Sequence, residues 1–138
     1  MKEANFQTFF GKYLKENPPA ETEVYELKIC KGTSLPFDAV KEHQVKGLLK
    51  AKTGLYHKIT DFPIFAGSKA RFNRPKPFDC IAFNQASGYV VVWFYKPRQK
   101  KIYYKIPIEK FLILKEQSTR KSFTEEMIQD ISEQIVIS

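Results

Sequence analysis

The chain has 138 residues, of which 43% are apolar and 14% aromatic, and its 23 Lys and Arg outnumber its 15 Asp and Glu. This composition excludes a disordered chain and fits one globular domain spanning residues 1–138. The longest apolar run, residues 89–95, is too short to span a bilayer, and residues 1–10 do not resemble a signal peptide. We therefore expect a soluble, intracellular (cytoplasmic) protein with no membrane partner.

The net charge of +8 favours a polyanionic partner. Nucleic acid is the stronger candidate, because no basic amphipathic helix of the kind that binds membrane surfaces is evident. Simple solubility is the alternative reason for such a charge.

The residue pattern in the first third of the chain predicts a helix, a strand and a second helix. Residues 5–16 place aromatic residues at helical spacing before two prolines, and residues 23–30 alternate as a strand. After a turn, a helix is expected from Ser34 or Asp38 to about Lys52, with Gln44 on its inward stripe. In this helix, Gly47 would allow a close approach to the neighbouring element.

The remainder predicts mostly strands. A short strand at 54–62 leads into a basic loop at 63–77, and residues 78–83 and 89–95 are predicted to form a β-hairpin. A further strand at 101–108 precedes a short element. The last predicted element is a helix at 126–135, whose isoleucines would complete the core or form a dimer contact. The pattern indicates an α/β (α+β) fold with a central mixed sheet flanked by helices.

The strand at 23–30 carries the residues that suggest chemistry. Glu26 and Lys28 are two residues apart and therefore project from the same face of the strand. Hydrolysis of a phosphodiester needs a hard divalent cation, which takes oxygen ligands, and a cation such as lysine beside the reactive phosphate. Leu27 between them turns its side chain inward and leaves its carbonyl available as a further metal ligand. Most E-x-K triplets simply lie on the solvated face of a strand. The neighbouring residues therefore decide whether this one is a functional site.

Residues 26–44, ELKICKGTSLPFDAVKEHQ, resemble the core of the PD-(D/E)XK nucleases, and most closely that of the RecU-type and phage Holliday junction resolvases. In those families an E-x-K strand precedes a Lys/Ser/Thr turn, a Phe/Pro helix start and a His-Gln pair. The resemblance covers roughly residues 20–50. It implies a restriction-endonuclease-like fold, dependence on Mg²⁺ (which Mn²⁺ can replace), a homodimer and cleavage of branched DNA, and a phage origin is compatible with it. It also implies that Glu26, Lys28 and Gln44 belong to the active site.

One feature of that family is missing from its usual place. The family has an aspartate metal ligand upstream of E-x-K, whereas here only Glu21 and Glu23 precede Glu26 in the short segment after the first helix. We expect Asp79, which opens an apolar strand after the basic loop, to supply this ligand instead. Asp61 is the second candidate.

Four basic residues in the loop at 63–77 are the predicted DNA contacts: Lys69, Arg71, Arg74 and Lys76. Phosphate contacts carry no base information, so recognition of DNA shape is expected. The leading hypothesis is a magnesium-dependent, structure-selective endonuclease that resolves Holliday junctions. Two alternatives stay open: a non-catalytic DNA-binding module on the same fold, and a restriction or repair nuclease acting on linear double-stranded DNA.

Overall fold

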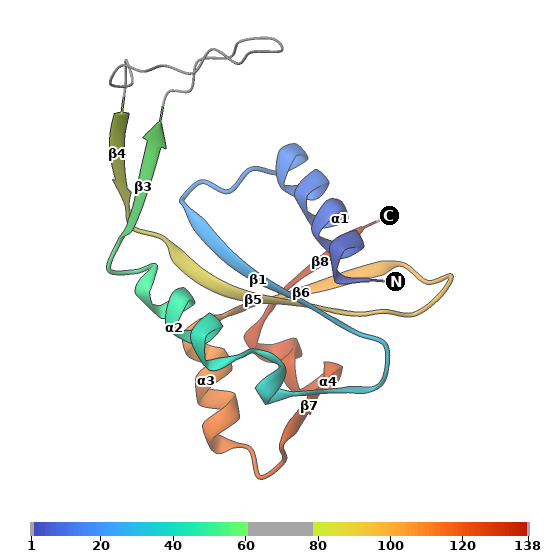
Figure 1. Ribbon diagram of the computed structural model, residues 1–138. Helices are drawn as coiled ribbons and strands as arrows, with labels where there is room; N and C mark the ends of the chain where they lie inside the picture. The colour runs from blue at the N-terminus through green and yellow to red at the C-terminus, as the bar shows by residue number, and fades with distance from the viewer. Residues whose placement is uncertain (1, 61–78, 138) are drawn as a thin grey trace, which may run out of the picture.

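A four-stranded mixed sheet forms the centre of the molecule (Figure 1). A computed structural model describes residues 2–60 and 79–137, and for residues 55–60 and 79–84 it describes the backbone. The strand order is β1-β5-β6-β8, in which β1 and β5 run parallel and the other neighbours are antiparallel. These strands are β1 (Glu23–Cys30), β5 (Ser87–Phe94), β6 (Lys101–Pro107) and β8 (Glu133–Ile137).

Helices and two small strand pairs surround this sheet. The helical elements are α1 (Glu3–Glu16), η1 (Phe37–Ala39), α2 (Glu42–Lys50), α3 (Ile108–Gln117), α4 (Glu125–Ile128) and η2 (Gln129–Ile131). The strand pairs are β2 (Ser34–Pro36) with β7 (Ser122–Thr124), and β3 (Leu55–Thr60) with β4 (Asp79–Asn84). In the described part of the chain, no helix is long and apolar enough to cross a membrane.

Each face of the sheet buries its own apolar cluster. Helix α1 covers one face, where Phe6 and Phe10 pack against Trp93 and Tyr103. Helices α2 and α3 cover the opposite face, where Leu48 and Phe111 join Val90 and Val92 in the other cluster. Strand β5 lies between the two layers, and its run of apolar residues is therefore buried on both sides. The observed fold is mixed α/β with a mixed sheet flanked by helices, as the sequence predicts.

The second predicted helix begins later than expected, at Glu42 rather than at Ser34 or Asp38. Residues 34–36 pair with β7 instead, and Pro36 cannot donate a backbone hydrogen bond to a helix. The helix starts where Gln44 accepts a hydrogen bond from the Lys41 backbone N–H at 2.8 Å. A polar side chain near the start of the helix thus defines its first turn.

The predicted hairpin between 78–83 and 89–95 is wrong. Strand β4 pairs with β3, and the chain then continues directly into β5 at the centre of the main sheet. The connection is held by the Ala86 N–H, which donates to the Ala51 carbonyl at 2.8 Å. The residues at 84–88 have turn-forming composition, but this bond ties them to the end of α2, so the chain does not turn back there.

The final predicted helix, at 126–135, is confirmed only in its first part. Residues 126–131 lie in α4 and η2, whereas residues 133–137 form strand β8. Three β-branched residues in succession, Ile135 to Ile137, favour this extended conformation. Ile128 and Ile135, which a helix would place on one stripe, are buried in the clusters on opposite faces of the sheet. These two isoleucines belong to the core, so they do not form a dimer stripe.

Candidate active site on strand β1

Glu26 and Lys28 lie side by side on the face of β1 that α2 covers. The Lys28 Nζ is 3.4 Å from the Glu26 Oε1, and the side chains of Lys28 and Glu26 are 14% and 24% exposed, respectively. The alternation predicted for this strand is confirmed, because Leu27 packs in the cluster beneath α1 while Val24 packs in the opposite one. The pair is thus half-enclosed on an otherwise apolar face.

Strand β1 lies at the edge of the sheet that the described residues form, so one side of its backbone has no partner strand there. Within residues 2–60 and 79–137, only β5 pairs with it. The Ser87 N–H donates to the Thr22 carbonyl at 3.1 Å and the Tyr95 N–H to the Cys30 carbonyl at 2.7 Å. In a regular ladder the N–H and C=O of a residue point to the same side and successive residues alternate. The even-numbered residues of β1 therefore face β5, and the odd-numbered ones, including Leu27, face outward.

The arrangement is compatible with a hard cation but does not complete its site. The Glu26 carboxylate and the outward-facing Leu27 carbonyl are both oxygen donors, the type that Mg²⁺ prefers. Among the described residues, however, no group of three or more His, Cys, Asp or Glu could hold a metal ion. The remaining metal ligands must come from side chains outside the described part of the chain or from water.

The structure gives Gln44 a local role. Its Oε1 accepts the Lys41 backbone N–H, and within the described ranges no hydrogen bond joins its side chain to Glu26 or Lys28. A glutamine on an inward stripe needs a polar partner, and the start of its own helix supplies one. Its part in catalysis stays a prediction.

The other predicted site residues cannot be placed at this site. Asp79 begins β4, where its backbone pairs with Thr60, and its side chain lies outside the part of the chain that the structure describes. Asp61 and the four predicted DNA contacts, Lys69, Arg71, Arg74 and Lys76, lie outside the described residues. The convergence of Asp79 and Glu26 is therefore still a prediction.

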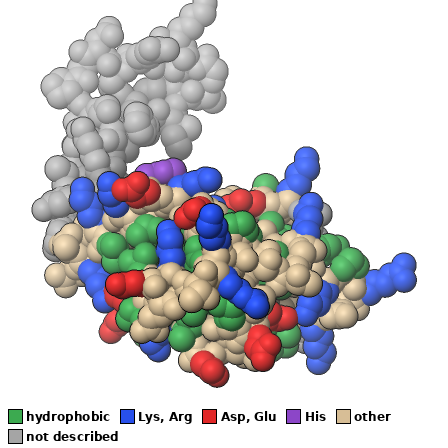
Figure 2. All heavy atoms as spheres, turned by 90° about the horizontal axis from the view of Figure 1, so that it is seen from below, with side chains coloured by type: hydrophobic (Ala, Val, Ile, Leu, Met, Phe, Trp, Pro, Cys, Tyr) green, Lys and Arg blue, Asp and Glu red, His purple; other side chains and the backbone are tan. Residues whose placement is uncertain are grey.

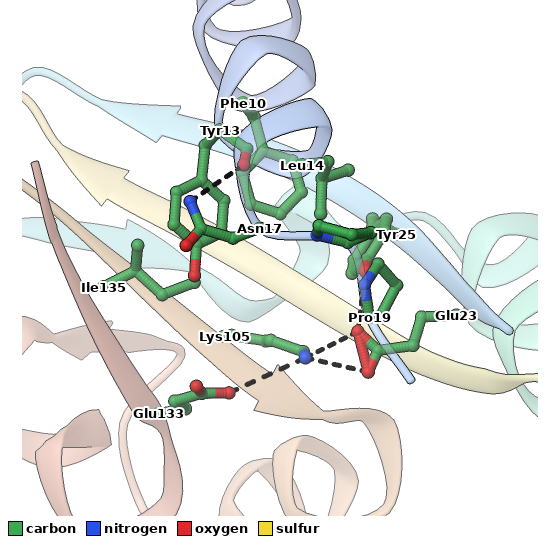
Figure 3. A pocket seen from close by; sticks show the side chains of 11 residues that line it. Phe10, Tyr13, Leu14, Asn17, Pro19, Glu23, Tyr25, Lys105, Glu133 and Ile135 are labelled. Carbon is green, nitrogen blue, oxygen red and sulfur yellow. Dashed lines mark hydrogen bonds and ion pairs between the residues drawn. The ribbon is translucent and has the colours of Figure 1, made fainter. Parts of the chain in front are cut away.

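A second polar cluster, which the sequence pattern did not predict, lies on the face beneath α1 (Figure 3). The Lys105 ammonium donates to both carboxylate oxygens of Glu23, at 2.6 and 2.8 Å, and the Tyr25 hydroxyl donates to the same carboxylate. They line a cavity of about 350 Å³ beside the end of α1, with Glu133 at its rim. Although burial lowers the pKa of Lys105, its bonds to Glu23 outweigh burial and raise it.

The signal for this cluster was present in the strand pattern. Glu23 shares a face with Tyr25 and Leu27, whose side chains point into the core, and a charge on such a face needs a partner. The partner lies two strands away, and sequence alone does not give that register. Both carboxylate oxygens of Glu23 accept hydrogen bonds from Lys105. Glu23 therefore does not take the place of the missing upstream aspartate as a metal ligand.

A third group joins Glu125 at the start of α4 to the main sheet. Its carboxylate accepts the Tyr104 hydroxyl at 2.6 Å and the Lys96 ammonium at 2.8 Å. Burial alone would raise the pKa of Glu125, but these two bonds outweigh it and hold the pKa below its ordinary value. Burial and the bond to Glu125 together raise the pKa of Tyr104 to about 12.

Comparison with models of known protein families, with curated proteins and with solved structures gives no match. The candidate site therefore rests on the residues and their arrangement.

Proposed function

We propose that the chain is a divalent-metal-dependent DNA endonuclease with a restriction-endonuclease-like core. The observation that carries this proposal is the half-enclosed pair of Glu26 and Lys28 beside the outward-facing Leu27 carbonyl. A carboxylate and a carbonyl can both hold a divalent cation that assists phosphodiester hydrolysis, and an ammonium can offset negative charge on the phosphate.

Each of these groups has a distinct part in the proposed reaction. Glu26 and the Leu27 carbonyl would hold Mg²⁺, with Asp79 as the expected additional acid. When bound, Mg²⁺ lowers the pKa of a coordinated water and stabilises negative charge on the phosphate. Lys28, 3.4 Å from the Glu26 carboxylate, would offset the charge that develops on the phosphate oxygens.

The proposed substrate is branched DNA, in particular a four-way junction, and the proposed active form is a homodimer. Two cuts at symmetric positions suit a protein with two-fold symmetry. Both parts rest on the resemblance of residues 26–44 to the junction resolvases. Linear double-stranded DNA is the competing substrate, and cleavage of matched junction and linear duplexes separates the two.

The direct test incubates the protein with four-way junction DNA and Mg²⁺. We expect Glu26→Gln and Lys28→Met each to reduce the cleavage rate at least a hundredfold. The matched control removes an exposed ion pair on α2, Glu42→Gln with Lys46→Met, and should cleave like the wild type. Equal cleavage by the wild type and both site variants would refute the assignment.

A non-catalytic DNA-binding module is the second candidate. It is favoured by the missing upstream aspartate, because only Glu21 and Glu23 precede Glu26 after the first helix. For this candidate, junction DNA would be bound but never cut, with or without Mg²⁺, and Glu26→Gln would leave binding unchanged.

A further inference from the structure

We propose that the open edge of β1 pairs with β1 of a second copy of the chain, antiparallel and centred on Leu27. The proposal concerns an interaction surface and does not depend on the proposed hydrolysis. Two observations lead to it: the exposure of this edge, and the distribution of charge along it.

The edge is accessible along nearly its whole length. Every residue from Glu23 to Ile29 is partly exposed, whereas the residues of β5 beside them are mostly buried. Among the described elements, only β5 pairs with β1. An unpaired strand edge of this length presents a row of free N–H and C=O groups, which readily accept another strand.

The backbone restricts the possible registers. Only the odd-numbered residues direct their N–H and C=O groups outward, so an antiparallel partner must place odd-numbered residues opposite odd-numbered ones. This condition also keeps each face of one sheet continuous with the same face of the other. It leaves a small series of registers, each shifted from the next by one step of the ladder.

The side chains then select one register from this series. Centring on Leu27 places Glu26 opposite Lys28 of the second copy, and by symmetry Lys28 opposite its Glu26. In the same register Val24 faces Cys30, and Tyr25 faces Ile29. The adjacent registers would instead place Glu26 opposite Glu26 or Lys28 opposite Lys28, and like charges directly opposite each other destabilise a sheet. Both the charged pairs and the apolar pairs therefore favour the register centred on Leu27.

Pairing in this register would join two four-stranded sheets into one. It would also engage the Leu27 carbonyl, which the proposed metal site uses. This dimer is therefore distinct from the proposed active homodimer, and we expect cleavage per chain to fall as it forms. Association can be measured without DNA or metal, and the two proposals therefore fail separately.

Charge reversal tests the pairing in the full-length chain by sedimentation over a concentration series. Either Glu26→Lys or Lys28→Glu alone creates two repulsive pairs and should weaken dimerisation roughly tenfold or more. The double variant restores opposite charges and should dimerise like the wild type. A wild type that stays monomeric at all concentrations, or single variants that dimerise unchanged, would overturn the proposal.

A cross-link tests the register itself. Val24→Cys places a thiol opposite the native Cys30 of the second copy, in a non-hydrogen-bonded pair whose spacing suits a disulfide. Within one chain the two positions lie at opposite ends of β1 and cannot be joined. We expect a disulfide-linked dimer under mild oxidation, and none from the control Val24→Cys with Cys30→Ser, which retains Cys80. If the wild type dimerises but the Val24→Cys variant forms no disulfide-linked dimer, the dimer uses another surface and the proposal is contradicted.

Discussion

Glu125 and Tyr104 make stability depend on pH in both directions. The pKa of Glu125 is below its ordinary value of 4.5, so its contribution to stability is present above that value and is lost as the pH falls through the folded-state pKa. The pKa of Tyr104 is raised from 10.0 to about 12, so its contribution is present below pH 10 and is lost as the pH rises towards 12.

Glu125→Gln should therefore lower the free energy of unfolding at pH 7 by about 1 kcal/mol and flatten its decline in acid. Urea unfolding at several pH values measures both effects. Glu126→Gln, at the exposed neighbouring position, is the control and should change neither. If the free energy of unfolding of the Glu125 variant declined in acid as steeply as that of the wild type, this carboxylate would not stabilise the fold.

At the scale of residues, the strand pattern predicted the Glu26–Lys28 pair because a strand alternates its side chains whatever it pairs with. The same pattern could not show that Gln44 would cap its own helix. That outcome depends on where α2 starts, and its start is fixed by the pairing of residues 34–36 with a distant strand.

At the scale of elements, the glycine that lets α2 approach the sheet closely is in strand β5 rather than in the helix. A Cβ on Gly88 would lie 2.5 Å from the Leu48 carbonyl oxygen, whereas a Cβ on Gly47 meets nothing within 4 Å. The helical pattern predicted this close approach at Gly47, which is exposed on the helix. A glycine in a helix is visible in sequence, but the face it occupies depends on packing.

The two glycines provide a matched pair of substitutions. Gly88→Ala should lower the free energy of unfolding by about 1–3 kcal/mol, because helix α2 has to move away from β5. Gly47→Ala should raise it by up to about 1 kcal/mol, because alanine favours the helix and has room there. Chemical denaturation measures both, and a neutral Gly88→Ala would mean that α2 is not seated on β5 as described.

At the scale of the whole molecule, the strand order was the feature that sequence could not provide. The pattern of apolar residues located β1, β5 and β6, whereas part of β8 was predicted as helix. The pairing of β5 with β1 and of β4 with β3 depends on contacts between distant segments. The wrong hairpin at 78–95 followed from assuming that consecutive strands pair, which is common but not general.

The charge of the molecule is unevenly distributed along the chain. Residues 61–78 contain four Lys or Arg and one acid, Asp61, so this short segment contributes +3 of the net charge of +8. On the face seen in Figure 2, the side of α3 and β7, basic and acidic side chains are interspersed. Lys96 is occupied by Glu125, and the Lys101 Nζ lies 3.6 Å above the Phe9 ring. The DNA contacts predicted for the basic residues at 69–76 stay a prediction.

Glutamine substitution of the four loop residues, Lys69, Arg71, Arg74 and Lys76, should weaken DNA binding. It should also reduce the slope of log Kd against log salt by roughly 2 to 4, because binding displaces about one counterion for each phosphate that the protein neutralises. Fluorescence anisotropy at several salt concentrations measures the slope. The control removes the same number of exposed charges elsewhere on the molecule, at Lys50, Lys110, Arg120 and Lys121. Equal slopes for the two variants would contradict a specific role for the loop.

The convergence of Glu26 and Asp79 on one cation is tested most directly by calorimetric titration of the wild type with Mn²⁺. Saturable binding is predicted for the wild type, at least tenfold weaker in Glu26→Gln and in Asp79→Asn, and unchanged in Glu42→Gln. No binding by the wild type, or binding indifferent to both acids, would contradict the account.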